Sequence, residues 1–442
     1  MRPWPDPVPA APPALTGPGL PRGGAPDWSR PAPAAPVRVL VALGNAALFG
    51  QERENIEVLR AVREAGVDAL FVTNERWGHH QIEPYLDRFG LGWTRLRYAL
   101  HFTHRLPKAQ LIPNVVRLGT GSRRFLQVLR RYRPTHVQVA NPHYFLCVLP
   151  ALLLTRTPVV FRLGDVPTVH HALYRQLWRR AILPRTARFV CVSEFIRGQI
   201  MALGAPREQT DVVYALPPMR PSQGGVSDLP ADLRDEASGR APRFAGRTVV
   251  FVGEVGEHKG VHLLVEAVGA LLREGHAVRL LVAGQSKAGA GSPFAARIHA
   301  LVEALPAGAD GRFLGYLEDV EGLLGLADVH AAPSVCEDAA PLVVLEAKRA
   351  GVPSVVFPAG GLPEFVRAPG VDGVVCADRS VPALVDGLRH FVTLEAGALD
   401  ASKAAARASL DALGITPAAF VQAWRRIYEE TRLGSSRATA TG

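Results

Sequence analysis

Cysteine is scarce in this sequence, and its few cysteines form no recognisable pattern. The 442 residues include only Cys147, Cys191, Cys336 and Cys376, each standing alone. Without a CxxC pair there is no zinc-ribbon spacing, and single scattered thiols give no disulfide framework. We therefore expect a reducing compartment and no metal site.

Long apolar runs are also missing. The longest candidate, residues 145–154, is too short for the roughly 20 residues that a membrane-spanning helix needs. Residues 1–36 are rich in proline and alanine, lack the basic and apolar regions of a secretory signal, and predict a disordered tail. We expect a cytoplasmic protein, attached at most to the inner face of the cytoplasmic membrane.

Several familiar nucleotide and nucleic-acid motifs are absent as well. The chain has neither the Walker spacing of a P-loop nor the glycine fingerprint of classical dinucleotide-binding enzymes. No zinc finger and no RNP-like aromatic set supports binding to nucleic acid. We expect no nucleic-acid partner.

Charge is distributed unevenly along the chain. Residues 37–220 contain 26 Lys and Arg against 12 Asp and Glu, whereas residues 221–442 contain 21 against 26. A basic half can face an anionic membrane or an acidic acceptor, and a solvated arginine-rich surface explains it equally well. Basic clusters stand at Arg123, Arg124, Arg130, Arg131 and Arg133, and at Arg175, Arg179, Arg180, Arg185 and Arg188.

Short apolar runs alternate with helical patterns in two separate stretches. This alternation is typical of βαβ units around a parallel sheet. It predicts an α/β protein of two Rossmann-like, doubly wound domains that face each other across a cleft. The expected division is a tail over 1–36, an N-terminal acceptor domain over 37–217, a linker over 218–245, a C-terminal donor domain over 246–400, and a helical segment and tail over 401–442.

The most informative segment is residues 333–347, PSVCEDAAPLVVLEA. We expect a strand to end where this segment begins, and Pro341 suits the first turn of a helix. The free N–H groups of that turn, at Leu342 and Val343, predict an anion site. Asp338 and Glu346 flank it, which suits a ligand with hydroxyls at both ends of a diphosphate. A helix capped by Glu337 or Asp338, with Glu346 at the surface, is the structural alternative.

Two further turns follow the same strand-to-helix plan. In residues 251–260, FVGEVGEHKG, Gly253 allows close backbone approach and Lys259 offers a positive charge for phosphate. In residues 360–364, GGLPE, Gly361 belongs to a glycine-rich turn that enters a helix, for which capping by Glu364 is an equally good explanation.

In this order and at these separations, the three segments resemble the C-terminal half of the retaining glycosyltransferase family 4 (glycosyl transferases group 1), which has the GT-B fold. The resemblance rests on Asp338, Glu346 and the Gly351-Val-Pro353 that follows. It implies that Asp338 contacts the donor sugar, Glu346 the nucleotide ribose and Lys259 the diphosphate. It also implies that main chain near Tyr316 meets the base.

Two positions depart from the family pattern. Asp338 stands where the family usually has Glu, so neighbouring Glu337 is a second candidate for the sugar contact. Glu254 stands where the family commonly has Arg or Lys. This loss of a cation predicts weaker diphosphate binding unless Lys287 or an arginine of the N-terminal half replaces it.

The N-terminal half offers candidates in the loop after residues 159–161. The family often places a His or Asp there, near the transferred sugar. Asp165, His170 and His171 fit this position, and helix capping by Asp165 with exposed histidines is the alternative.

The sequence thus predicts transfer of a sugar from a UDP- or GDP-sugar, with no cofactor, to a glycan or lipid-linked acceptor. Retention is implied by the family resemblance, and the absence of a DxD motif fits a metal-independent reaction. The alternatives are a nucleotide-sugar epimerase of the same architecture and a transferase-like binding protein with weak or no activity.

Overall fold

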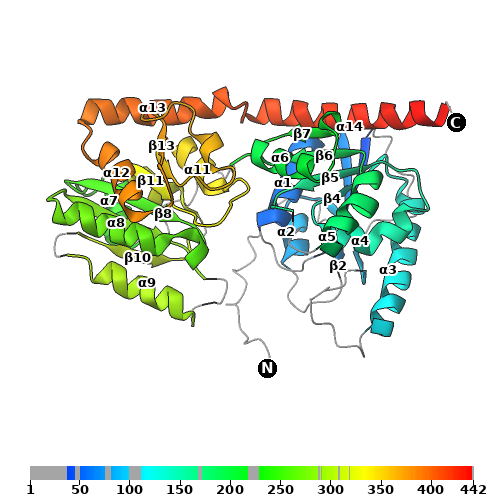
Figure 1. Cartoon of the computed structure of the whole chain (residues 1–442), viewed down its shortest axis with the longest axis horizontal. Helices are drawn as coiled ribbons and strands as arrows, with labels where there is room; N and C mark the ends of the chain where they lie inside the picture. The colour runs from blue at the N-terminus through cyan, green and yellow to red at the C-terminus, as the bar shows by residue number, and fades with distance from the viewer. Residues whose placement is uncertain are drawn as a thin grey trace.

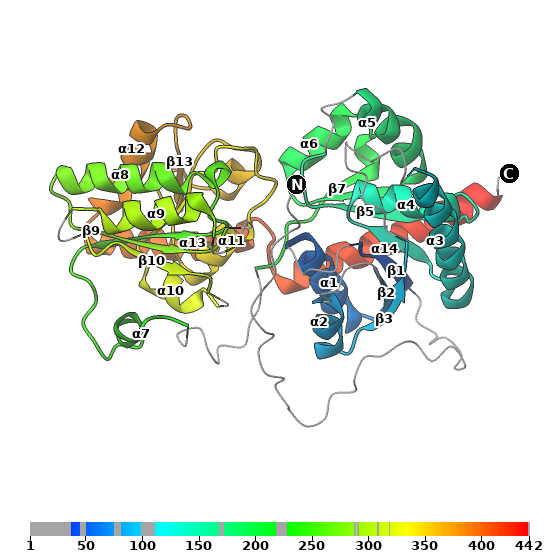
Figure 2. The same ribbon diagram turned by 90° about the horizontal axis from the view of Figure 1, so that it is seen from below.

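The chain forms two parallel β-sheets, one in each half (Figure 1). Figure 2 shows each sheet between helices that cover both of its faces. The prediction of two Rossmann-like, doubly wound halves is confirmed. The computed structural model describes residues 37–44, 50–74, 81–98, 111–167, 172–217, 228–286, 289, 291–306, 309–317 and 319–440, so the predicted tail over 1–36 lies outside it.

The N-terminal sheet has seven strands in the order β3-β2-β1-β4-β5-β6-β7. Its central strands are buried on both faces, as parallel strands usually are, and they are mostly apolar with Arg38, His136, Gln138 and Arg162 among the buried residues. The strands are β1 Val37–Ala42, β2 Val67–Asn74, β3 Gly92–Leu96, β4 His136–Val139, β5 Val159–Leu163, β6 Arg188–Cys191 and β7 Thr210–Val212. The helices are α1 Gly50–Arg63, α2 Ile82–Arg88, α3 Leu111–Tyr132, α4 Pro142–Leu152, α5 Ala172–Leu177 and α6 Glu194–Ala202.

The C-terminal sheet repeats this plan with six strands in the order β10-β9-β8-β11-β12-β13. Its strands are β8 Arg247–Val252, β9 Val278–Ala283, β10 Arg312–Gly315, β11 Val329–Ala332, β12 Ser354–Val356 and β13 Gly373–Val375. Its helices are α8 Val261–Arg273, α9 Pro293–Glu303, α10 Glu321–Leu326, α11 Leu342–Ala350, α12 Val381–Val392 and α13 Ala396–Ala412.

Part of the predicted linker over 218–245 belongs to the C-terminal half. Its second half contains helix α7, Ala231–Ala237, whose Leu233 is buried in an apolar cluster of the C-terminal half. Glu236 of α7 accepts two hydrogen bonds from the buried guanidinium of Arg279 on β9, at 2.6 and 2.7 Å. The mixed charges that suggested a linker include this buried pair, so the C-terminal unit begins before residue 246.

The last helix, α14 Pro417–Ala440, returns to the N-terminal half. Figure 1 shows it continuing the line of α13 and crossing to the opposite sheet. There Trp424 and Tyr428 are fully buried against residues of β1 and α1, and Tyr428 donates to Gln138 of β4 at 2.6 Å. Within the helical segment and tail predicted over 401–442, α14 is therefore part of the N-terminal core, whereas residues 401–412 belong to α13, which contacts α11 of the C-terminal half.

Strand order reverses at one point in each sheet, between β1 and β4 and between β8 and β11. Ligands of such sheets bind beyond the carboxyl ends of the strands at this switch point. The loops after β8 and β11 are the two segments whose motifs the sequence singled out. None of the described helices combines the length and the apolar character that a membrane span needs.

Candidate functional site

The loop after β8 brings Lys259 to the loop after β11. A 3-10 turn over Glu257–Lys259 leads into α8 through Gly260. Gly260 has φ +69°, and a Cβ there would lie 1.9 Å from the carbonyl oxygen of Pro333. Only glycine allows this approach, which fixes the lysine beside the carboxylates that follow Pro333.

Lys259 forms an ion pair with Asp338. The two side chains are 25% and 12% exposed, and Ser334 also donates to Asp338 at 3.2 Å. The sequence predicted both residues at one site, and the structure brings them into contact. The carboxylate offsets the charge of the lysine and uses one of the three N–H donors of its ammonium group.

Glu337 points to a different set of partners. Its carboxylate accepts a hydrogen bond from Arg379 at 2.5 Å and another from the N–H of Gly360. Of the two adjacent carboxylates, it is Asp338 that faces Lys259, while Glu337 fastens the loop to the 358–361 turn. In this geometry Glu337 braces the loop, and Asp338 lies at the predicted ligand position.

The first turn of α11 supplies free backbone donors. The sequence placed Pro341 inside this turn, but Pro341 is the residue before it, and the helix begins at Leu342. The first N–H groups of a helix have no partner within it, so those of Leu342 and Val343 are available to a ligand. Leu342 also borders a cavity of about 770 Å³, which α1, α14 and Leu216 line at the domain junction.

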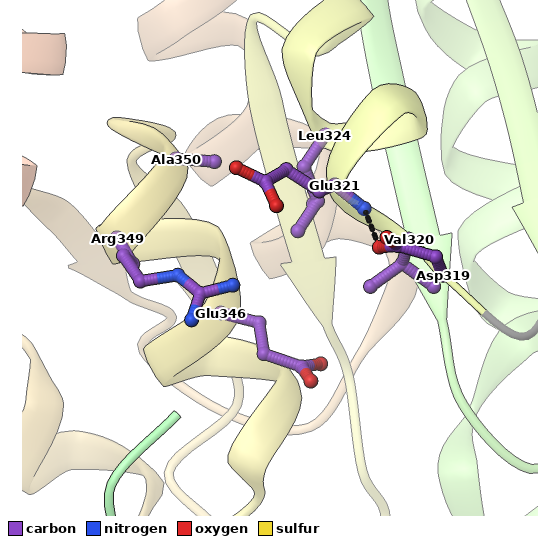
Figure 3. Close-up of a pocket in the computed structure, with 7 residues that line it drawn as sticks. All are labelled: Asp319, Val320, Glu321, Leu324, Glu346, Arg349 and Ala350. Carbon is purple, nitrogen blue, oxygen red and sulfur yellow. Dashed lines mark hydrogen bonds between the residues drawn. The ribbon is translucent and has the colours of Figure 1, made fainter. Parts of the chain in front are cut away.

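Glu346 is the fifth residue of α11, about one turn from the start of the helix. It borders a small pocket of about 120 Å³ together with Arg349 of the same helix. Figure 3 shows these two side chains on α11 facing the loop and first turn of α10, where Asp319 accepts from the N–H of Glu321 at 2.9 Å. Glu346 and Arg349 thus line a pocket between α11 and the start of α10.

Three other predicted donor-site residues differ in their surroundings. Tyr316 follows β10 and is 58% exposed, so its side chain is accessible. The N–H of Gly253 donates to Ala283 at 3.0 Å, and this group is therefore occupied within the sheet. The N–H of Gly361 donates to the carbonyl oxygen of Asp338 at 2.7 Å, which ties the glycine turn to the acidic loop.

Glu254, where the family commonly has a cation, faces a histidine. Its carboxylate lies 3.5 Å from Nε2 of His258, one turn further along. Lys287, proposed as a replacement cation, lies outside the described residues. The described part of the loop after β8 therefore carries the Lys259 ammonium group and, at Glu254, a carboxylate beside His258.

The N-terminal candidates are only partly described. Asp165 follows β5 and is exposed, whereas His170 and His171 lie outside the described residues. Among the side chains that the structure describes, no group of three or more His, Cys, Asp or Glu is arranged to hold a metal ion.

Sequence reasoning missed three residues that hold the site together. They are Arg379, which contacts Glu337, and Ser193 and Tyr214, which reach the C-terminal half from the N-terminal half. Their partners lie 42 to 150 positions away in the chain. No local spacing marks them, because only the folded arrangement places them at the site.

Two family models match the chain, one in each half. The model "Glycosyltransferase Family 4" covers residues 50–215, and "Glycosyl transferases group 1" covers residues 241–408. The second match includes Lys259, Asp338 and Glu346. The two matches follow the division of the chain into two sheets.

Curated relatives agree with these models. The glycogen synthase of Mycobacterium tuberculosis is 34% identical over 324 residues, which span 72% of each chain. The putative colanic acid biosynthesis glycosyltransferase WcaL of Escherichia coli is 26% identical over 253 residues, covering 52% of this chain and 56% of that protein.

Solved structures share the fold over nearly the whole chain. A glycosyltransferase from Rickettsia africae superimposes with a TM-score of 0.72 at 15% identity, covering 89% of this chain and 98% of its own. HepE from Anabaena, in complex with UDP and glucose, superimposes with a TM-score of 0.68 at 17% identity, covering 89% of this chain and 99% of its own. The chain therefore belongs to glycosyltransferase family 4 and is a glycosyltransferase of the GT-B fold.

Proposed function

We propose that the protein transfers a sugar from a UDP- or GDP-sugar to a glycan or lipid-linked acceptor, with retention of the anomeric configuration and without a metal ion. The observation that carries this proposal is the contact between Lys259 and Asp338 beside the open first turn of α11. One cation, one carboxylate and free N–H groups there match a sugar joined to a diphosphate.

In the proposed reaction, Lys259 exchanges its internal partner for the donor. The diphosphate takes the ammonium group, and the N–H groups of Leu342 and Val343 stabilise the charge that develops on the leaving phosphate. Asp338, released from the lysine, accepts hydrogen bonds from sugar hydroxyls. Glu346, one turn along α11, accepts those of the ribose. Asp165 and His170 remain candidates for contacting the transferred sugar from the N-terminal half.

Metal independence follows from the same groups. A cation and a helix N-terminus do the work that a divalent ion performs in other transferases, which is to neutralise the departing diphosphate. We expect turnover to change by less than about twofold when EDTA is added, because no step needs a bound ion. A large loss that magnesium or manganese restores would contradict this part of the proposal.

A lipid-linked acceptor at the inner membrane face rests on the basic N-terminal half. Arg123, Arg124 and Arg130 are exposed on α3, and Val116 on the same helix is 58% exposed. An arginine-rich helix face with an exposed apolar residue suits contact with anionic lipid. Flotation with anionic liposomes at low salt tests this; protein left at the bottom of the gradient contradicts it.

A donor screen tests the function as a whole. The purified chain is incubated with individual UDP- and GDP-sugars and a panel of glycan and lipid-linked acceptors, starting with UDP-glucose because a structural neighbour was solved with UDP and glucose. Product mass and anomeric proton couplings report transfer and configuration. Donor incubated alone separates transfer from epimerisation, since an epimerase alters the sugar without an acceptor.

A further inference from the structure

The first turn of α6, in the N-terminal half, is completed by a carboxylate from the C-terminal half. Glu364 accepts hydrogen bonds from the N–H groups of Glu194 at 2.8 Å and Phe195 at 2.6 Å. Ser193, the N-cap residue, accepts from Ile196 at 3.3 Å. The first three N–H groups of the helix are thus satisfied, two of them from the other domain.

Two further contacts support the same junction. Tyr214, which follows β7, donates to Glu364 at 3.0 Å, and its ring packs against Phe365 with centroids 5.6 Å apart. Burial and the neighbouring Glu364 carboxylate raise the pKa of Tyr214, so its hydroxyl stays protonated and donates. A carboxylate at a helix N-terminus that accepts three hydrogen bonds makes a strong and directional contact.

The junction also reaches the acidic loop of the donor site. Ser193 donates to the carbonyl oxygen of Ala339 at 2.6 Å, and Ala339 directly follows Asp338. Gly361 allows this approach, because a Cβ there would lie 2.3 Å from that same carbonyl oxygen and 3.1 Å from Ser193. The loop that presents Asp338 to Lys259 is therefore held from the opposite domain.

We propose that Ser193, Tyr214 and Glu364 form an interdomain clamp that positions Asp338 for catalysis. The clamp ties the orientation of the two domains to the position of the acidic loop. Its residues act through that loop, so they are positioning residues. The clamp itself is independent of the chemistry, but its effect on turnover rests on the proposed function.

The clamp predicts a separation between turnover and nucleotide binding. Lys259, Leu342 and Glu346 belong wholly to the C-terminal half, so binding of UDP or GDP does not need the clamp. Transfer of the sugar also needs Asp338 in its position beside Lys259 and the two domains in their correct relative orientation. Glu364→Gln removes the charge and weakens both backbone contacts, and Ser193→Ala removes the hold on Ala339. We expect each to lower kcat by about tenfold and to change nucleotide affinity by less than about threefold.

The experiment combines kinetics with amide exchange in the full-length protein. Glu364→Gln should speed exchange of the Glu194 and Phe195 amides, while Glu274→Gln, which breaks an exposed ion pair with Arg389 on the C-terminal half, should change neither exchange nor kcat. Because both residues act through one loop, the Ser193→Ala and Glu364→Gln double variant should lose less than the product of the single losses. If Glu364→Gln does not fold, Tyr214→Phe removes a single hydroxyl and carries the same prediction with a smaller loss.

Unchanged exchange at α6, or unchanged kcat in Glu364→Gln, would overturn the clamp. A loss of nucleotide affinity as large as the loss of kcat would also overturn it, since that pattern means a general disturbance of the donor site. If the wild type transfers no sugar from any donor, the proposed function fails instead, and the exchange result alone then upholds or overturns the contact between the domains.

Discussion

The two halves of the molecule share a strand order but differ in what their residues do. Both sheets follow the same doubly wound plan, yet residues 37–220 are strongly basic and residues 221–442 slightly acidic. The C-terminal half gathers Lys259, Asp338 and Glu346 around a single switch point. The N-terminal half offers an arginine-rich surface instead. One fold can thus carry a small cluster of paired charges at a strand-order switch point in one copy and a broad charged surface in the other.

The largest expected effect comes from removing charged side chains of the candidate site in the C-terminal half. Lys259→Ala removes the only cation that contacts Asp338 in the described loops, and Glu346→Ala removes the predicted ribose contact. Lys259→Ala should lower donor turnover by about a thousandfold, as expected when a group that stabilises the leaving phosphate is lost. Glu346→Ala should lower kcat/KM by at least about tenfold, because it removes a binding contact to the ribose. Steady-state kinetics with the donor found in the screen provides the measurement.

A matched control keeps this result specific. Glu266 is an exposed glutamate on α8 of the same half, and Glu266→Ala should retain full turnover. Full activity in Lys259→Ala or Glu346→Ala would sink the assignment of the donor site to the C-terminal half.

The second test weakens the packing of α14, the last helix of the chain, on the N-terminal half. Trp424 is fully buried and lies under the guanidinium of Arg162, whose Cζ is 5.6 Å from the ring centroid. Trp424→Ala should cost about 3–5 kcal/mol of unfolding free energy, through lost burial and the cavity left behind. Urea unfolding followed by circular dichroism measures it.

Arg425→Ala lies on the same helix at a half-exposed position and should cost less than about 0.5 kcal/mol. Equal stability of Trp424→Ala and the wild type would mean that α14 does not belong to the N-terminal core.

The third test uses a feature common to both halves. His136 on β4 and His330 on β11 are fully buried, and burial lowers the pKa of each from 6.5 to about 4. Above pH 6.5 both are neutral in the folded and unfolded chain. As pH falls from 6.5 towards 4, only the unfolded chain takes up the proton, so folding should lose about 3 kcal/mol for each histidine.

Urea unfolding at pH 7, 6 and 5 measures this loss. His330→Gln should reduce the slope of the unfolding free energy against pH by the amount that corresponds to one proton. The contribution of His136 to that slope should remain. A slope that His330→Gln leaves unchanged would show that this histidine is not buried neutral.

The smallest expected effect concerns the basic surface. Replacing Arg123 and Arg130 of α3 by serine should weaken binding to anionic liposomes by about thirtyfold, since each exposed arginine contributes about 1 kcal/mol near such a surface. Replacing the exposed Arg273 and Arg297 of the C-terminal half should have little effect. Equal losses in both pairs would indicate a response to net charge rather than to the N-terminal half.

Much of the fold was predictable from the sequence because the strands of a parallel sheet are short and mostly apolar and alternate with helical patterns. The runs at 312–315 and 329–332 coincide with β10 and β11. Helix α7 was hidden because Glu236 looks like a surface charge until Arg279 is placed against it. The return of α14 was hidden because an amphipathic pattern shows that a face is buried but not what buries it.

The candidate site was predictable to a similar degree. The strand-to-helix turns placed Lys259 and Asp338 at one sheet edge, and the structure brings them into contact. Which acidic side chain faces the lysine depended on Arg379, whose position follows from the packing of β13 and α12. The clamp at Glu364 joins residues of two domains, and no pattern within one segment reveals such a contact.

The central claim is that the C-terminal half alone holds a nucleotide diphosphate through Lys259 and Glu346. Isothermal titration calorimetry with UDP and GDP on the wild type, Lys259→Ala, Glu346→Ala and Glu266→Ala tests it most directly. We expect one nucleotide to bind at one site per chain, both site variants to bind at least about tenfold more weakly, and Glu266→Ala to bind like the wild type. Binding of neither nucleotide to the wild type, or equal binding to all four proteins, would contradict it.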